Sequence, residues 1–564
     1  MKKIFILALI LPGYFISKSQ SIGIGTAAPN ASARLDMTST GKGLLIPRMG
    51  TASITAISNL AKGLLVYDSA KNLLMVNTGT ANVPNWQTIV AGSGWSLTGN
   101  AGTDTAKDFI GTTDAQPLLF RINNKWAGMI DSASGNSYLG FGAGKNSTTA
   151  VFNTGYGYKA LESNTTGNYN TAFGSQTLYS NANGASIGNN NTAVGYQALL
   201  SNLGNTGNTA VGFQALYQAT SNLNTAVGYQ ALFHSGGGAS TATGAQALYN
   251  GGGYSNTAFG AKALYSSLSS ASYNTATGYE ALFSNVSGSY NTANGYQALH
   301  SNTSGQFNCA FGSSALHANT YGNQNTSVGF NSLLNTTGSD GNTALGFLAG
   351  ASWDNGYYNC FIGPDADANG TDYYNTIALG YNTRVTAPNM MRVGNNATTS
   401  IGGPVDWSTI SDGRVKKNMQ ENVPGLSFIT KLRPVSYNMD LSAVDRITQP
   451  PAQKDATGRI MEKIVPADMA AALKAKEQIV YTGFVAQEVE QLAQSQHYAF
   501  SGVDAAKNDK DLYGLCYSDF VVPLVKAVQE LSARNDQLTK DNELLAKQNE
   551  LVMQRIAALK AKIH

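Results

Sequence analysis

The sequence predicts a mostly β protein: a solenoid of stacked repeats of about 17 residues, followed by a small α+β domain and a C-terminal coiled coil. Three observations in the 564-residue chain support this prediction. A short glycine-containing motif recurs between residues 134 and 400, and charged residues are nearly absent from the same stretch. A heptad pattern of apolar residues then runs through residues 524–564.

Charge is distributed unevenly along the chain. Residues 1–133 hold 17 charged side chains, residues 134–400 hold 12 and residues 401–564 hold 40. A net charge of +3 without a basic cluster excludes a nucleic-acid-binding protein. A hydrophobic fraction of 42% excludes a disordered polar tract. Three cysteines are too few for a disulfide scaffold.

Residues 1–19 have the order of a secretory signal peptide. Lys2 and Lys3 precede an apolar run, and small residues follow up to Ser19, after which we expect cleavage. A membrane anchor would need about 20 apolar residues, whereas Pro12 interrupts this shorter run. We therefore expect a secreted protein, extracellular or at the cell surface, with no transmembrane segment after signal removal.

The next segment, residues 20–133, carries short alternating strands separated by glycine and proline, which predict a small β-rich domain. The pattern lies in the blocks Ile22–Thr26, Ala33–Asp36, Gly43–Met49 and Gly63–Asp68. These blocks resemble the N-terminal module of exported bacterial tail-fibre-like proteins. The residues themselves assign the module no activity.

Residues 134–400 are built from one repeat, whose clearest copy is Asn-Thr-Ala-Val-Gly-Tyr-Gln-Ala-Leu at residues 191–199. Its glycine falls at positions 140, 157, 174, 195, 212, 228, 244, 260, 278, 295, 312, 329, 346, 363 and 380. Leucine follows four residues later in eleven copies, and Tyr or Phe follows directly in ten. A low-complexity linker would not hold leucine at one position.

A single unit of 17 residues cannot bury its own apolar face, so we expect the copies to stack and bury it against one another. Stacking would form continuous ladders of leucine and of aromatic rings, with Asn, Ser and Gly at the corners. Cys309 and Cys360 occupy the same repeat position. We expect them in one column about 14 Å apart, too far for a disulfide.

The repeat units resemble the Ala-Val/Ile-Gly-x-x-Ala repeats in the heads of trimeric autotransporter adhesins. The resemblance covers about residues 140–395, and the period is longer here than in the usual heads. It implies a left-handed parallel β-roll and a homotrimer, with three chains arranged around the roll axis.

Residues 524–564 predict a parallel coiled coil, because an apolar heptad holds for six repeats and a lone surface helix would not keep a period of seven. One column is Leu524, Leu531, Leu538, Leu545, Val552 and Leu559; the other is Val528, Asn535, Asn542, Asn549, Ile556 and Ile563. Three asparagines at a positions fix the register, but they do not choose between two and three strands.

Residues 401–523 and the start of the heptads contain five separated motif blocks. They are Ser411–Asn418, Gly425–Tyr437, Gly483–Val489, Tyr517–Asp519 and Val522–Leu531. In this order they resemble the C-terminal intramolecular chaperone domain of endosialidases and phage tail spikes, which is also a self-cleaving peptidase. The resemblance implies a domain that helps three chains fold and then releases itself by autoproteolysis.

The same resemblance implies a Ser–Lys catalytic dyad. Ser411 matches the nucleophile and Lys416 the base, so the implied cleavage site is the Ile410–Ser411 bond. A lysine can act as a base once partial burial lowers its pKa. The reaction is single-turnover and implies no external substrate. Val415 stands where Leu is usual, and residues 441–478 resemble an insertion.

Two alternatives stay open: a structural surface fibre that does not cleave, and a polysaccharide-degrading protein of the tail-spike kind. Glycoside hydrolysis needs two neighbouring carboxylates, and within the repeats only Asp365, Asp367 and Asp372 are grouped in sequence. The group imitates a calcium loop without its final Glu, and the five histidines lack ligand spacing. We therefore expect no metal and no cofactor. The surface ligand, a glycan or a protein, is not identified.

Overall fold

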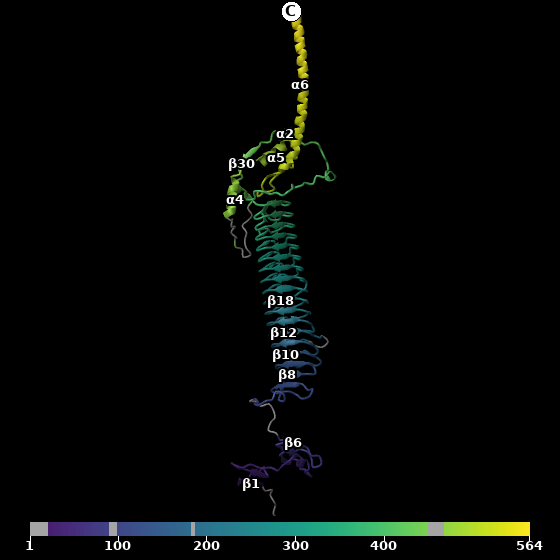
Figure 1. Cartoon of the computed structure of the whole chain (residues 1–564), viewed down its shortest axis with the longest axis vertical. Helices are drawn as coiled ribbons and strands as arrows, with labels where there is room; N and C mark the ends of the chain where they lie inside the picture. Colours follow the sequence, from purple (N-terminus) through teal and green to yellow (C-terminus); the bar gives the residue numbers. More distant parts are fainter. Residues whose placement is uncertain are drawn as a thin grey trace, which may run out of the picture. The chain divides into compact units, whose positions relative to one another are not determined.

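The computed structural model describes residues 21–89, 99–181, 187–352, 354–405, 407–448, 459 and 467–563 (Figure 1). The predicted signal peptide lies outside the described residues. The chain divides into two compact units, Met1–Gly111 and Thr112–His564. No helix in the described ranges is long and apolar enough to cross a membrane.

The first unit is a small β domain. β1 (Ile22–Ile24) pairs in parallel with β2 (Leu35–Met37), and a four-stranded sheet follows with a short helix, α1 (Thr51–Thr55). The sheet consists of β3 (Arg48–Met49), β4 (Leu65–Asp68), β5 (Leu73–Asn77) and β6 (Trp86–Thr88). Its core contains Ile54, Val66 and Met75.

The second unit begins with an antiparallel hairpin that leads into a long parallel ladder. β7 (Leu118–Ile122) and β8 (Lys125–Asp131) pair with each other, and β8 pairs with β9 (Asn136–Leu139). The hairpin covers the edge of the first rung, where an open parallel edge would otherwise be exposed. The sheet therefore begins at residue 118, within the stretch 20–133 that sequence assigned to the N-terminal module.

From β9 onward each repeat contributes one short strand to the ladder, in register with the strands of the neighbouring repeats. The strands are β10 (Thr154–Tyr156), β11 (Thr171–Phe173), β12 (Thr192–Val194), β14 (Thr209–Val211), β16 (Thr225–Val227), β18 (Thr241–Thr243), β19 (Thr257–Phe259), β20 (Thr275–Thr277), β21 (Thr292–Asn294), β22 (Cys309–Phe311), β23 (Thr326–Val328), β24 (Thr343–Leu345), β25 (Cys360–Ile362), β27 (Ile377–Leu379) and β29 (Met391–Val393). The predicted solenoid of stacked repeats is confirmed.

Two minor parallel sheets accompany the ladder on the rungs where the chain is extended a second time. One consists of β13 (Ser201–Asn202), β15 (Gln218–Ala219) and β17 (His234–Ser235). The other pairs β26 (Asp367–Ala368) with β28 (Arg384–Val385) near the end of the roll. Cys309 and Cys360 are both free and belong to one column of the main ladder, as predicted.

The repeat pattern explains the core of the roll. In the repeat at 191–199, Ala193 and Leu199 are fully buried, and the same positions of neighbouring repeats form one continuous core. The predicted leucine ladder is thus present. The ring directly after the glycine faces outward: Tyr196 is 44% exposed and stacks on Phe213 with ring centroids 5.3 Å apart.

The asparagine that precedes most of the ladder strands links neighbouring rungs by hydrogen bonds. Asn291 is fully buried; its Oδ1 accepts a hydrogen bond from the backbone N–H of Asn308 at 3.0 Å. Its Nδ2 donates to the carbonyl of Gly305 at 2.8 Å. Each such side chain therefore joins neighbouring rungs and satisfies backbone groups inside the roll, where an unpaired polar group would be costly.

The turn after most of the repeat glycines uses left-handed backbone at two positions that are not glycine. Gln197 has φ 54° and Leu199 has φ 52°. This conformation costs roughly 1–2 kcal/mol for a residue with a side chain. It persists because the two amides bond to opposite neighbours: Gln197 N donates to the carbonyl of Ser175, and Leu199 N to that of Ala215, each at 3.0 Å.

We expect Gly260→Ala to destabilise the roll strongly. Gly260 has φ +141°, and an added Cβ would lie 2.4 Å from the carbonyl oxygen of Gly278 in the next rung. The clash is with backbone, so the cost should be at least about 2 kcal/mol. Gly236→Ala is the matched control, because its Cβ would meet nothing closer than 3.8 Å. Thermal unfolding followed by circular dichroism measures both, and equal midpoints would contradict the stacking.

The residues that directly follow the buried leucines form a second column of stacked rings, and two of these rings are histidines. Phe283, His300 and His317 stack with centroid separations of 5.3 and 5.1 Å. Burial, together with the smaller effect of the nearby His300, lowers the pKa of His317 to about 4. Burial also lowers the pKa of His300, against the attraction of the Glu280 carboxylate.

We therefore expect the roll to lose stability in mild acid. The pKa of folded His317 lies below that of an unfolded histidine, about 6.5, so the unfolded chain takes up the proton first as the pH falls. The free energy of unfolding should fall between pH 6.5 and about 4, by at most about 1.4 kcal/mol per pH unit from this residue. His317→Phe keeps the stacked ring and should flatten this slope in thermal unfolding at several pH values; an unchanged slope would contradict the assignment.

Beyond the roll lies a small domain of helices and short strands. Its elements are η1 (Gly413–Val415), α2 (Leu426–Ile429), β30 (Val435–Tyr437), α3 (Leu441–Thr448), α4 (Ala467–Glu477), β31 (Tyr481–Gly483), α5 (Ala486–Ser495), β32 (Val503–Asp504), β33 (Gly514–Leu515) and η2 (Tyr517–Phe520). β30 pairs with β31 and β32 with β33, both antiparallel. The core contains Phe428, Val489, Ala493 and Phe520.

The chain ends in a single long helix, α6 (Val521–Ile563), of 43 residues. Its first turns belong to the small domain, where Pro523 and Ala527 are buried. The heptad leucines beyond them are not covered: Leu538 is 52% exposed and Leu545 is 54% exposed. The predicted heptad seam, which is apolar except for Asn535, Asn542 and Asn549, is therefore open to solvent in a single chain.

Candidate functional site

Ser411 and Lys416 are brought together at the boundary between the roll and the small domain. Lys416 Nζ donates a hydrogen bond to Ser411 Oγ at 2.8 Å. The single 3₁₀ turn η1 between them folds the chain back so that the two side chains meet. This is the contact that a Ser–Lys dyad needs. The side chain before the predicted cleavage site, Ile410, is 86% exposed.

The η1 turn is stabilised by Asp412 and Arg414, which lie between Ser411 and Lys416 in the sequence. Asp412 caps η1: its Oδ1 accepts from Arg414 N and its Oδ2 from Arg414 Nε, both at 2.9 Å. The hydrogen bond to the Arg414 guanidinium lowers the pKa of the Asp412 carboxyl. Ser411 and Lys416 themselves are exposed within one chain. In a Ser–Lys dyad the lysine needs partial burial to lose its proton, and a single chain does not bury Lys416.

The other motif blocks of the small domain converge on the start of α6. Leu426 N donates to Glu530 Oε2 at 2.8 Å, which fastens the start of α2 to the long helix. Phe484 N donates to the Tyr517 hydroxyl at 3.1 Å. Each bond joins two blocks that lie far apart in sequence, so the blocks act together as one folding unit.

A second link ties the strand region to α5. Arg433 Nε donates to Glu488 Oε2 at 3.0 Å. The Arg433 guanidinium lowers the pKa of the Glu488 carboxyl. The pair is solvent-exposed, so its contribution to stability is small.

The small domain also contacts the last rungs of the roll through polar side chains. We call this contact between residues 386–398 of the roll and the small domain the junction. Lys476 Nζ in α4 donates to the carbonyls of Asn396 and Thr398, both at 2.7 Å. Asn508 Nδ2 donates to the carbonyl of Thr386 at 2.8 Å. These carbonyls lie at the end of the ladder, where no further rung follows in the chain to donate hydrogen bonds to them.

A buried carboxylate lies at the centre of the junction. The Asp511 side chain is 1% exposed and lies 3.7 Å from Arg392 Nη2. Asp511 Oδ1 also accepts a hydrogen bond from the Thr386 hydroxyl, and Oδ2 accepts from Lys507 N at 3.0 Å. These bonds outweigh burial and lower the pKa of the Asp511 carboxyl. The junction therefore holds a charged, fully paired centre.

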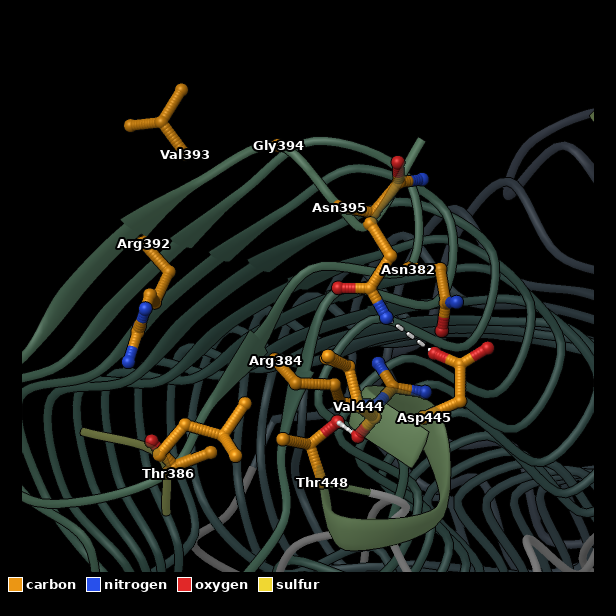
Figure 2. Close-up of a pocket in the computed structure, with 12 residues that line it drawn as sticks. Asn382, Arg384, Thr386, Arg392, Val393, Gly394, Asn395, Val444, Asp445 and Thr448 are labelled. Atoms are coloured by element: carbon orange, nitrogen blue, oxygen red, sulfur yellow. Dashed lines mark hydrogen bonds between the residues drawn. The ribbon is translucent and has the colours of Figure 1, made fainter. Parts of the chain in front are cut away.

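A cavity of about 240 Å³ opens at the junction (Figure 2). Roll residues on one side face α3 on the other, and a hydrogen bond from Asn396 to Asp445 crosses between them. Arg384 and Arg392 both line the cavity. Arg384 already pairs with Asp365, and Arg392 already pairs with Asp511. The cavity is therefore a polar part of the junction and not a free anion site.

The aspartates considered for hydrolysis or calcium have structural partners. Asp365 Oδ1 pairs with Arg384 Nη2 at 2.9 Å. Asp367 is fully buried, and its Oδ2 accepts from Ser352 N at 3.0 Å. Burial raises the pKa of Asp367, against the attraction of Arg384. Asp372 is exposed. Within the described ranges, no group of three His, Cys, Asp or Glu side chains could hold a metal ion.

Sequence reasoning missed the junction. Lys476 lies in the stretch 441–478 that was interpreted as an insertion, and its partners precede it by 80 and 78 residues. Asn369 contacts the carbonyl of Lys510 across 141 residues. No local periodicity records contacts of this kind. The only signal was indirect: a charged stretch placed directly after a nearly uncharged roll.

Comparison with known families gives one match. Residues 23–104 match the family model described as the phage tail like trimerisation region. No curated protein matches the chain. The match lies in the first unit, and it agrees with the resemblance of this segment to tail-fibre-like modules. The chain is thus similar, over residues 23–104, to the trimerisation region of phage tail-like proteins.

Proposed function

We propose that the chain is a homotrimeric fibre, secreted or displayed at a surface, with the repeat roll as its shaft and α6 as a C-terminal coiled coil. The observation that carries the proposal is the exposed heptad seam of α6, with Leu538 at 52% and Leu545 at 54% exposure. An apolar stripe of this length is stable in water only against other helices. The trimerisation-region match at residues 23–104 favours three chains.

The outer face of the roll supports the same assembly. The residue before each repeat glycine points away from the core and is apolar in most copies. Val194 is 38% exposed, and Val211 and Val227 are each 37% exposed. Stacked in register, they form a second apolar stripe, which would be covered where rolls pack side by side.

Light scattering on the full chain with Ser411→Ala, which keeps the chain whole, tests the trimer. The expected mass is that of three chains, and it should not change when the protein is diluted moderately. A mass of one chain would overturn the fibre proposal, and a mass of two would overturn its stoichiometry.

We further propose that the small domain assists folding of the roll as an intramolecular chaperone. The junction supports this role, because Lys476 and Asn508 satisfy carbonyls at the last rungs. A parallel ladder folds slowly and exposes its edge until it is complete. A preformed domain that binds this edge would fix the register from which the earlier rungs stack.

Cleavage of the Ile410–Ser411 bond is the second part of this proposal, supported by the 2.8 Å contact between Lys416 Nζ and Ser411 Oγ. In the neutral form, Lys416 would accept the Ser411 hydroxyl proton as Oγ attacks the carbonyl carbon of Ile410. The C–N bond then breaks, the proton passes to the new amine of Ser411, and an ester links Ile410 to Oγ. Water hydrolyses the ester, leaving the Ile410 carboxylate and the free Ser411 hydroxyl.

Mass spectrometry of the folded wild-type chain tests cleavage. The expected product is a fragment that begins at Ser411. A wild-type chain that stays whole after complete folding would favour the alternative, a structural fibre that keeps its C-terminal domain. A polysaccharide-degrading fibre is less favoured, because Asp365 and Asp367 are engaged by Arg384 and Ser352.

A further inference from the structure

Within the described ranges, the segment that carries Ser411 and Lys416 makes no hydrogen bond to described residues elsewhere in its own chain. We call residues 399–424 the arm. Hydrogen bonds of its described residues join arm residues to one another, such as Lys416 to Ser411 and Arg414 to Asp412. Apart from η1 the arm has no regular structure.

The arm is unusually apolar for an exposed segment. Six large apolar side chains are 61–86% exposed: Ile401, Val405, Trp407, Ile410, Val415 and Met419. Trp407 alone is 80% exposed. Isolated apolar residues on a surface are ordinary, but six within one segment indicate a contact that a single chain does not make.

The small domain and the last residues of the roll line a groove of about 590 Å³ with no arm residue in its lining. The groove runs along the antiparallel pair β30–β31 and the loop before η2, and its lining is mostly apolar, with Asn395, Asn396, Lys476 and Gln487 among its polar residues. Its lining includes Val435, Tyr437, Leu441, Tyr481, Tyr513 and Leu515. Tyr437 and Tyr513 are 37% and 36% exposed. The volume falls within the range of about 300–1,000 Å³ that buries apolar ligand groups.

The groove and the arm both abut the start of α6, which carries the proposed interface between chains. The arm ends at α2, where Leu426 N bonds to Glu530 of α6. The groove ends at Tyr517 in η2, which runs directly into α6 at Val521. Chains joined along α6 therefore hold the arm of one copy and the groove of another at the same level of the helix. The arm's 26 residues can span up to about 85 Å when extended, which suffices to cross between copies.

We propose that the arm of one chain packs into the groove of a neighbouring copy, so that the assembled chains exchange arms. The inference rests on the proposed homotrimer. It accounts for two open apolar surfaces with one contact, since the indole of Trp407 and the side chain of Ile410 would enter a groove lined by tyrosines. Ser411 and Lys416 lie within the exchanged segment, so the neighbouring copy would supply the surroundings that the dyad lacks within one chain.

Disulfide trapping in the full chain tests the exchange. Both partners carry Ser411→Ala to keep the chain whole, and Ser in place of Cys309, Cys360 and Cys516. One tagged copy carries Trp407→Cys; the co-expressed copy, with a different tag, carries Tyr513→Cys. After mild oxidation we expect a cross-linked species with both tags on a non-reducing gel. A second pair, Ile410→Cys with Tyr437→Cys, guards against one badly placed cysteine. Leu544→Cys with Tyr513→Cys is the control, because Leu544 is also exposed but lies on α6.

Two results would overturn arm exchange. One is the absence of mixed cross-links at both pairs. The other is a cross-link that forms only when both cysteines are in the same chain. Light scattering on the same samples separates the two proposals: trimers without mixed cross-links refute arm exchange alone, whereas monomers refute the trimer and the exchange together.

Discussion

Ser411→Ala is expected to abolish cleavage at the Ile410–Ser411 bond, so that the chain stays whole after folding while the wild type yields a fragment beginning at Ser411. The substitution removes the attacking oxygen, and loss of a nucleophile lowers such rates by at least about 1,000-fold. Lys416→Ala should have the same effect, because the hydroxyl then has no base 2.8 Å away. Lys416→Arg should also fail, since a guanidinium does not give up its proton near neutral pH.

Two neighbours serve as matched controls for the dyad. Ser408→Ala and Lys417→Ala change the same residue types within a few residues of the site. Both variants should cleave as the wild type does. Mass spectrometry at fixed times after refolding measures the wild type and the five variants. Cleavage of Ser411→Ala at the wild-type rate would remove Ser411 as the nucleophile.

Replacing two seam leucines by aspartate, Leu538→Asp with Leu545→Asp, is expected to dissociate the trimer. Both side chains are about half exposed in a single chain, so the change does not disturb the fold of one subunit. In the coiled coil, however, each would place an unpaired carboxylate in an apolar core, which costs several kcal/mol per site. Light scattering should then report single chains.

Lys540→Asp with Lys547→Asp is the control for the seam. These residues lie on the same turns of α6 but at the heptad position opposite the seam. The control should remain trimeric. A seam variant that keeps the mass of three chains would show that other surfaces, such as the outward valines of the roll, are sufficient to hold the assembly.

The repeat architecture was predictable because each of its determinants recurs at a fixed spacing. The glycine, the alanine before it and the leucine after it mark the turn and the core of every rung. Stacking of identical units then follows from the need to bury a face that one unit leaves exposed. The heptads of α6 were predictable for the same reason. The hand of the roll came from the family resemblance alone, and it stays a prediction.

Other features could not be predicted because they depend on neighbours in space. A leucine rarely adopts positive φ, yet Leu199 does so because its amide is drawn toward the carbonyl of Ala215 in the next rung. The asparagines expected at corners are buried ties between rungs, as Asn291 shows. The contact of Lys476 with the end of the roll joins residues 80 positions apart, so no local sequence pattern predicts it. The motif predicted Ser411 and Lys416 as a pair, and the structure places them in contact. Their catalytic role stays a prediction, and their exposure within one chain could not be predicted from the motif.

The most direct test of the whole account is one denaturing gel that compares the wild-type chain with Ser411→Ala, each loaded boiled and unboiled. If the chain is a trimer, unboiled samples of both proteins migrate as trimers. After boiling, the wild type should give two fragments and Ser411→Ala a single intact chain. Unboiled samples that migrate as single chains, together with an intact boiled wild type, would contradict both the trimeric assembly and the cleavage.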